Sequence, residues 1–157
     1  MAAGYAHRVD DQVITTTSAQ ETESFAATFA EKLGAGDVVL LAGELGSGKT
    51  TFVRGAARAL GVAGPVTSPT FAIGNIYAGA DREIAHLDLF RLDALATDDE
   101  AVLEDFLTPN RVSFVEWPHD ELRLAARLRA VVTFEHAGGD GRTIGVAWRE
   151  AKAGEAA

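Results

Sequence analysis

The feature that most constrains this chain is a glycine-rich stretch that follows a short apolar run. The stretch is GELGSGKT, Gly43 to Thr50, and it fits the pattern G-x-x-x-x-G-K-[ST]. The run before it, Val38 to Ala42, has the length of a buried strand, and Lys49 to Leu60 predicts a helix that ends at Gly61. This strand–loop–helix context is the one that a phosphate-binding loop requires.

The residues of this loop have distinct expected tasks. Gly43, Gly46 and Gly48 allow a tight turn that presents backbone N–H groups to phosphate oxygens. Lys49 would place a point charge on the β- and γ-phosphates, and the Thr50 hydroxyl would bind Mg²⁺. The alternative is a glycine-rich turn without a ligand, but the strand before the loop and the helix after it favour phosphate binding.

Two acidic residues stand where predicted strands end. Glu116 ends an apolar strand that Pro118 stops, which is where P-loop ATPases place the acid that holds Mg²⁺ through water or orients the attacking water. Asp88 ends the predicted strand EIAHLDLF and is a second candidate for either task. The alternatives are a solvated Glu116 and an Asp88 that caps a helix. Both acids can converge with the loop, because such sheets bind ligands beyond the carboxyl ends of their strands.

Other candidates have equally plausible structural explanations. The segment TSPTF, with Ser68, Pro69 and Thr70, has the position of a loop that senses the γ-phosphate in P-loop switches, and it is also typical of an ordinary turn. Trp117 could stack on a nucleotide base or pack as a core or interface aromatic. A lone histidine in a strand, such as His86, is more often a hydrogen-bonded packing residue than a catalyst.

Several arginines and one tryptophan stay outside the predicted chemistry or on its margin. Arg91 could pair with a phosphate or form a plain salt bridge with Asp88. The arginines of ELRLAARLRA favour a solvated short helix over the basic lid of a small kinase. Trp148 is expected to pack in the last strand. No N-K-x-D element for guanine recognition occurs in the sequence, which argues against a GTPase.

The pattern of elements predicts an α/β fold, a P-loop NTPase-like three-layer sandwich with a mixed, mainly parallel central sheet. Ser18 and Glu21 form a capping box before a helix, Thr97 and Glu100 cap a second short helix, and LRAVVTFEH with RTIGVAWRE predicts a hairpin. With 157 residues we expect a single domain over 1–152 and a flexible C-terminal tail over 153–157.

Charge and composition limit the classes of partner. The formal net charge of −9 argues against a chain that grips DNA or RNA alone, because phosphate neutralisation needs clustered Lys and Arg. The absence of cysteine excludes disulfides and thiolate chemistry and fits a reducing cytoplasm. The N-terminus has no apolar signal segment, and no apolar run approaches a membrane span.

Together, the motifs carry a family resemblance. GELGSGKTTF, TSPTF, HLDLFR and VEW occur in this order, and the chain from about Ser18 through Trp117 resembles the TsaE family (also called YjeE). Only the first motif is specific alone; the ordered set of four carries the resemblance. One departure is Phe90, where the family usually has Tyr, so any hydrogen bond from that hydroxyl is in doubt.

The resemblance implies a function and a set of residues. It implies an ATPase, weak alone, that binds ATP or ADP with Mg²⁺ and serves the TsaB–TsaD complex, in which TsaD places a threonylcarbamoyl group on the adenosine next to the anticodon. Contact with tRNA is then indirect. Thr50 and Glu116 would serve Mg²⁺, Asp88 would be the other important acid, Ser68–Thr70 the switch loop and Trp117 the aromatic near the base. The residues implied to hold the phosphates are Glu44, Leu45, Gly46, Ser47, Gly48, Lys49, Thr50 and Thr51.

Two other classes of protein would also use this loop. A small-molecule or protein kinase needs an acceptor pocket and a basic lid, and the sequence shows neither clearly. A binding module that uses nucleotide only to set its shape is the third possibility, and two acids at separate strand ends, Asp88 and Glu116, speak against it.

Overall fold

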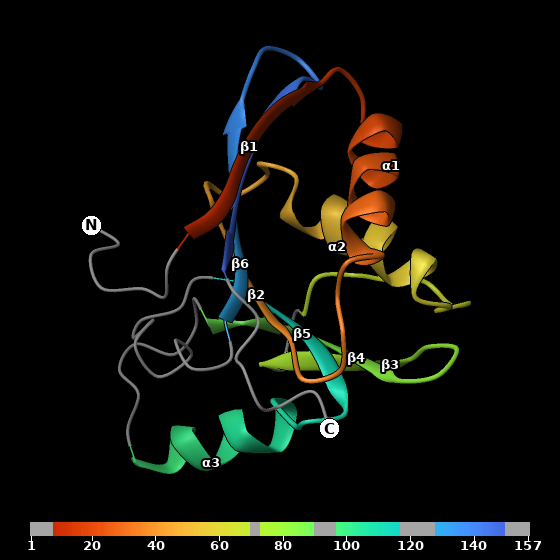
Figure 1. Ribbon diagram of the computed structural model, residues 1–157, viewed down its shortest axis with the longest axis vertical. Coiled ribbons are helices and arrows are strands. Elements are labelled where there is room, and N and C mark those ends of the chain that lie inside the picture. The colour runs from red at the N-terminus through yellow and green to blue at the C-terminus, as the bar shows by residue number, and fades with distance from the viewer. Residues whose placement is uncertain (1–7, 70–72, 90–96, 117–127, 150–157) are drawn as a thin grey trace.

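The computed structural model describes residues 8–69, 73–89, 97–116 and 128–149, and these form a seven-stranded sheet with helices on both faces (Figure 1). The strands are β1 (Arg8–Thr16), β2 (Val38–Gly43), β3 (Gly74–Ala78), β4 (Glu83–Asp88), β5 (Arg111–Glu116), β6 (Leu128–His136) and β7 (Arg142–Arg149). The helices are α1 (Ala19–Ala30), α2 (Lys49–Ala59) and α3 (Thr97–Phe106).

The sheet has a parallel centre and antiparallel edges. Its order is β1-β7-β6-β2-β5-β4-β3. Strand β2 runs parallel to both β5 and β6, and β4 runs parallel to β5. The pairs β6–β7, β1–β7 and β3–β4 are antiparallel, so the predicted C-terminal hairpin is confirmed. The prediction of a mixed sheet with a mainly parallel core is confirmed as well. Because β2, β4, β5 and β6 are parallel, their carboxyl ends all lie along the same edge of the sheet, the one that runs across the strands.

Alternating side chains divide the core between the two faces of the sheet. On one face, Val39 and Leu41 of β2 pack with the helices α1 and α2 in a cluster rich in aromatic rings. On the other face, Val38 and Leu40 pack with residues of α3 in an aliphatic cluster. Strand β2 is therefore buried on both faces, as expected of a central parallel strand. Figure 1 shows α1 and α2 together and α3 well apart from them.

The first helix begins as predicted, with one difference in its capping bonds. The Ser18 hydroxyl accepts a hydrogen bond from the Glu21 N–H at 3.1 Å, which confirms the N-cap. The Glu21 carboxylate, however, accepts from the N–H and the hydroxyl of Thr17 and not from Ser18. These two donors lower the pKa of Glu21. The returning bond of the capping box is therefore made to Thr17, one residue before the N-cap Ser18.

Strand β1 is an element that the sequence interpretation missed. It pairs with β7 through a register in which Ile14 lies opposite Ile144. From Asp11 to Thr16, only Ile14 and Thr16 turn inward, and Val13 is 72% exposed. An edge strand with one weakly apolar face gives little periodic signal. The predicted tail 153–157 lies outside the described residues, and the single-domain prediction stays a prediction. No helix in the described ranges is long and apolar enough to cross a membrane.

Candidate functional site

The loop between β2 and α2 has the backbone shape that its glycines predict. Gly46 and Gly48 have positive φ angles of 75° and 107°, the region that residues with side chains rarely adopt. Gly43 is required for a different reason: a Cβ there would lie 2.8 Å from the Phe134 carbonyl oxygen of the neighbouring strand. The loop therefore lies directly against the end of β6.

Lys49 begins α2 and is almost fully buried, with 5% of its surface exposed. Its ammonium donates to the carbonyl oxygens of Gly43 at 2.5 Å and Glu44 at 3.2 Å. Burial lowers the pKa of Lys49, and the charges of Glu116 and Asp88 act in the opposite direction. A buried cation thus lies at the end of β2, within the electrostatic reach of both acids.

The two predicted acids meet at the edge of the sheet where the loop begins. Asp88 and Glu116 are paired residues of β4 and β5, and Glu116 is paired with Leu41 of β2 on its other side. Glu116 is only 3% exposed. Its side chain points to the α2 face, because it alternates with Val112 and Phe114 of that cluster. The predicted convergence of the loop and both acids is confirmed.

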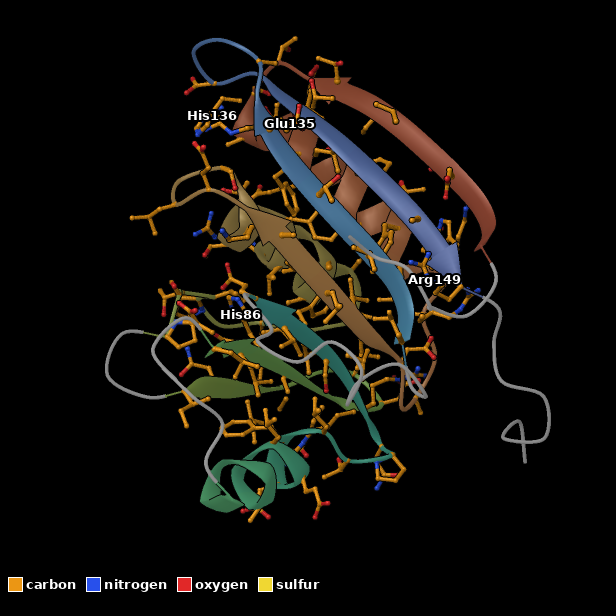
Figure 2. The ribbon with its side chains drawn as sticks, turned by 90° about the vertical axis from the view of Figure 1, so that its left-hand side faces the viewer. His86, Glu135, His136 and Arg149 are labelled. Carbon is orange, nitrogen blue, oxygen red and sulfur yellow. The ribbon has the colours of Figure 1, made fainter. Side chains whose placement is uncertain are left out.

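His86 is more closely tied to this site than its sequence context indicated. It is completely buried, and its Nε2 lies 2.7 Å from Oε2 of Glu116. With Glu116 ionised, Nε2–H donates to the carboxylate, which holds that oxygen in place. Among the described residues Nδ1 has no hydrogen-bond partner. Figure 2 shows His86 within the sheet, apart from Glu135 and His136 at the end of β6. The H-x-D spacing, which places two side chains on one face of a strand, was the available signal.

Arg142, the first residue of β7, contacts the loop and was not among the predicted site residues. Its Nε donates to the Ser47 carbonyl oxygen at 3.0 Å and its Nη2 to that of Gly46 at 3.2 Å. The rule that found Asp88 and Glu116 considers the residues where strands end and not those where strands begin. Strand β7 is antiparallel to β6, so its first residue lies at that same edge.

The remaining predicted residues lie in different environments. Thr50 and Thr51 occupy the first turn of α2 and are half-buried, whereas Leu45 at the tip of the loop is 91% exposed. In the proposed switch segment Ser68 is exposed and Pro69 is buried. The predicted residues that lie outside the described ranges are Thr70, Phe90, Arg91 and Trp117.

The start of the proposed switch segment is anchored to β3. The Tyr77 hydroxyl accepts from the Thr67 N–H at 3.2 Å and donates to the Thr67 carbonyl oxygen at 3.1 Å. The Asn75 amide donates to the same carbonyl oxygen at 3.2 Å. Thr67 is therefore held at both backbone groups, while Ser68 next to it is exposed.

The donor set of the site suits a phosphate with its metal ion. The Ser47 hydroxyl is buried and has no hydrogen-bond partner among the described residues, so the loop offers a donor in addition to its N–H groups. Thr50 and Glu116 carry oxygen atoms of the hard kind that Mg²⁺ prefers. Mg²⁺ usually takes one or two protein oxygens together with waters and phosphates. Within the described ranges no group of three or more acids or histidines is placed to hold a metal ion.

The fold and the site define a class: a mixed α/β protein in which a glycine-rich loop joins a buried central strand to a helix beside a buried lysine and two acids. Residues 16–144 match the model of the family described as threonylcarbamoyl adenosine biosynthesis protein TsaE. The chain belongs to this family, and the resemblance seen in the four ordered motifs is confirmed.

Individual relatives agree with this assignment. The tRNA threonylcarbamoyladenosine biosynthesis protein TsaE of Bacillus subtilis is 34% identical over 129 residues, which cover 82% of this chain and 80% of that protein. The protein of the same name from Synechocystis is 38% identical over 100 residues, which cover 62% of this chain and 64% of that protein. The crystal structure of Bacillus subtilis YdiB has a TM-score of 0.66 and 30% identity, and covers 92% of this chain and 90% of that one.

Proposed function

We propose that this chain binds Mg·ATP on the loop between β2 and α2 and hydrolyses ATP to ADP and phosphate. We further propose that this activity serves the TsaB–TsaD complex that forms threonylcarbamoyladenosine in tRNA, in keeping with the names of the relatives. The observation that carries the proposal is the gathering of Lys49, Asp88 and Glu116 at one edge of the sheet, beside the loop.

Each residue has a task in this proposal. The loop from Glu44 to Thr51 would enclose the phosphates, and Lys49 would stabilise the charge that develops on the γ-phosphate. Thr50 and Glu116 would hold Mg²⁺, which neutralises phosphate charge when bound, and Glu116 with Asp88 would orient the attacking water. The hydrogen bond from His86 restricts the Glu116 carboxylate to one orientation.

The charge of the chain favours indirect contact with tRNA. A net charge of −9 repels a polyanion, so the tRNA would be bound by the partner complex and not by this subunit. We place the protein in the cytoplasm, since a chain without cysteine fits a reducing compartment. Exposed groups near the site, such as Leu45 at the tip of the loop, are available to a partner protein.

Steady-state phosphate release from Mg·ATP tests this function. We expect slow release by the purified chain alone and faster release when a TsaB–TsaD pair and tRNA are added. A matched assay with γ-labelled ATP follows the fate of the phosphoryl group. Label that appears on an acceptor instead of free phosphate would replace the ATPase by a kinase. Bound nucleotide without any release would replace it by a binding module.

A further inference from the structure

We infer that Arg142 is a positioning residue that sets the conformation of the phosphate-binding loop from the outside. Within the part of the chain that the structure describes, the Arg142 guanidinium donates to four backbone carbonyl oxygens. Two belong to the loop, Gly46 and Ser47. The other two, Gly139 and Gly141 in the β6–β7 turn, accept from Nη1 at 3.0 and 2.7 Å. One guanidinium thus joins two loops that are about a hundred residues apart in sequence.

The chemistry of such a loop explains why these carbonyls need a partner. A loop that turns its N–H groups toward an anion turns its carbonyl groups away from it. A carbonyl that accepts from a positioned side chain is less free to rotate than one that accepts from water, so the N–H groups of the loop keep their direction. The planar fork of an arginine fixes the directions of its donors and so holds two neighbouring carbonyls in a fixed relation, whereas the donors of a lysine ammonium rotate on a flexible stem. Gly46 and Ser47 are held in this way.

The position of Arg142 follows from the topology of the sheet. Gly43 at the end of β2 is paired with Phe134 of β6, and two residues later His136 is paired with Arg142. The hairpin therefore returns at the level of the loop. The turn itself is firm, because the Ala137 N–H donates to the Gly141 carbonyl oxygen at 3.0 Å and the Gly141 N–H donates to that of Gly138 at 2.8 Å. The guanidinium thus donates to the β6–β7 turn on one side and to the loop between β2 and α2 on the other.

Charge adds to geometry at this position. None of the acids in the described residues forms an ion pair with Arg142, and its guanidinium donates to carbonyl dipoles there. A permanent cation next to the loop favours an anionic ligand. The effect on nucleotide affinity rests on the proposed function, whereas the ordering of the loop does not.

Two variants and a matched control separate these effects. Arg142→Ala removes the fork and the charge, and Arg142→Lys keeps the charge without the fork. Arg111→Ala is the control, since Arg111 at the start of β5 also donates to two backbone carbonyl oxygens, those of Asp105 and Phe106 at the end of α3, away from the site. The measurements are amide hydrogen exchange of residues 44–48 and the affinity for Mg·ADP by calorimetry.

In Arg142→Ala we expect faster exchange at residues 44–48 with unchanged exchange in β2, and an affinity lower by about tenfold to a hundredfold. Arg142→Lys should show smaller changes than Arg142→Ala in both the exchange and the affinity. Arg111→Ala should change neither the exchange nor the affinity. Wild-type exchange and affinity in Arg142→Ala would overturn the inference, and so would full recovery in Arg142→Lys. If Arg142→Ala does not fold, the lysine variant decides alone. A wild-type chain that binds no nucleotide would overturn the proposed function, and the exchange comparison would still decide the role of Arg142.

Discussion

The two faces of the central sheet differ in chemistry although the same strands build both. The face covered by α1 and α2 carries Phe29, Phe52 and Trp148, and Phe29 lies 5.2 Å from Phe52 and 4.7 Å from Trp148 between ring centroids. The face covered by α3 is filled mainly by valine and leucine. Only the first face carries the buried charges of the site, because His86 and Glu116 both point to it.

This difference shows how the fold accommodates buried charge. Polar side chains on the α2 face are placed at the edge where the strands end, and the helix that covers this face begins there with Lys49. The Glu116 carboxylate is hydrogen-bonded to Nε2 of His86, and the Lys49 ammonium donates to two carbonyl oxygens. Burial of charge is tolerable under these conditions, because each group has a partner. The α3 face needs no such arrangement.

The largest expected effect is a difference in stability loss between leucine-to-alanine substitutions on the two faces of the sheet. Leu41 on the α2 face and Leu87 on the α3 face are both fully buried in strands. We expect Leu41→Ala to lower the free energy of unfolding by about 3–5 kcal/mol and Leu87→Ala by about 2–3 kcal/mol. The physical reason is that α3 can shift into a cavity more easily than two packed helices. Urea denaturation of both variants measures this, and equal losses would contradict it.

The next effect concerns ligand binding and turnover. Lys49→Ala should reduce the affinity for Mg·ATP by roughly a hundredfold or more, because a buried phosphate loses its cation. The Glu116→Ala protein should still bind nucleotide but should no longer hydrolyse ATP. Calorimetry and phosphate release distinguish the two.

A control from the opposite face sharpens the ligand-binding comparison. Ser113 lies on the same strand as Glu116, is 1% exposed and points to the α3 face. Ser113→Ala should leave affinity and turnover at the wild-type level. Unchanged turnover in Glu116→Ala would remove that residue from the mechanism.

A smaller effect is expected in the pH dependence of nucleotide binding. Burial lowers the pKa of Lys49. The affinity for nucleotide should therefore begin to fall at a lower pH than it would if Lys49 had the pKa of an ordinary lysine. Glu116→Gln should move this fall to still lower pH, because the Glu116 charge raises the pKa of Lys49. The contribution of Lys49 to stability has the opposite trend: in the window between its folded and unfolded pKa the unfolded chain binds more protons, so stability rises with pH. Binding isotherms across the alkaline range test the shift, and Ser113→Ala should show none.

The smallest expected effect lies at the start of α1. Ser18→Ala removes the acceptor for the Glu21 N–H and should cost about 1 kcal/mol of stability. Ser18→Asn, which can also cap a helix, should retain most of it. Thermal unfolding measures both variants, and a loss in Ser18→Asn equal to that in Ser18→Ala would show that the hydroxyl does not act as a cap.

Local patterns in the sequence predicted the elements that have strong signals. The glycine spacing with Lys49 defines the loop, a continuous apolar run defines β2, and Ser18 marks the start of α1, because each of these depends on a few neighbouring residues. Family resemblance and the common rule for strand ends were sufficient to bring Asp88 and Glu116 to the loop. Edge strand β1 was missed, because its pairing partner β7 lies more than a hundred residues away.

Only the tertiary structure decided how the charged groups of the site are held. The bond between His86 and Glu116 depends on the register of β4 against β5, and the contacts of Arg142 depend on a hairpin that returns to the edge where β2 ends. Such pairs join residues about thirty or a hundred positions apart, and no local pattern encodes their distance. The sequence by itself thus determined which chemistry the loop and acids bring, whereas the folded sheet determined which side chains orient them.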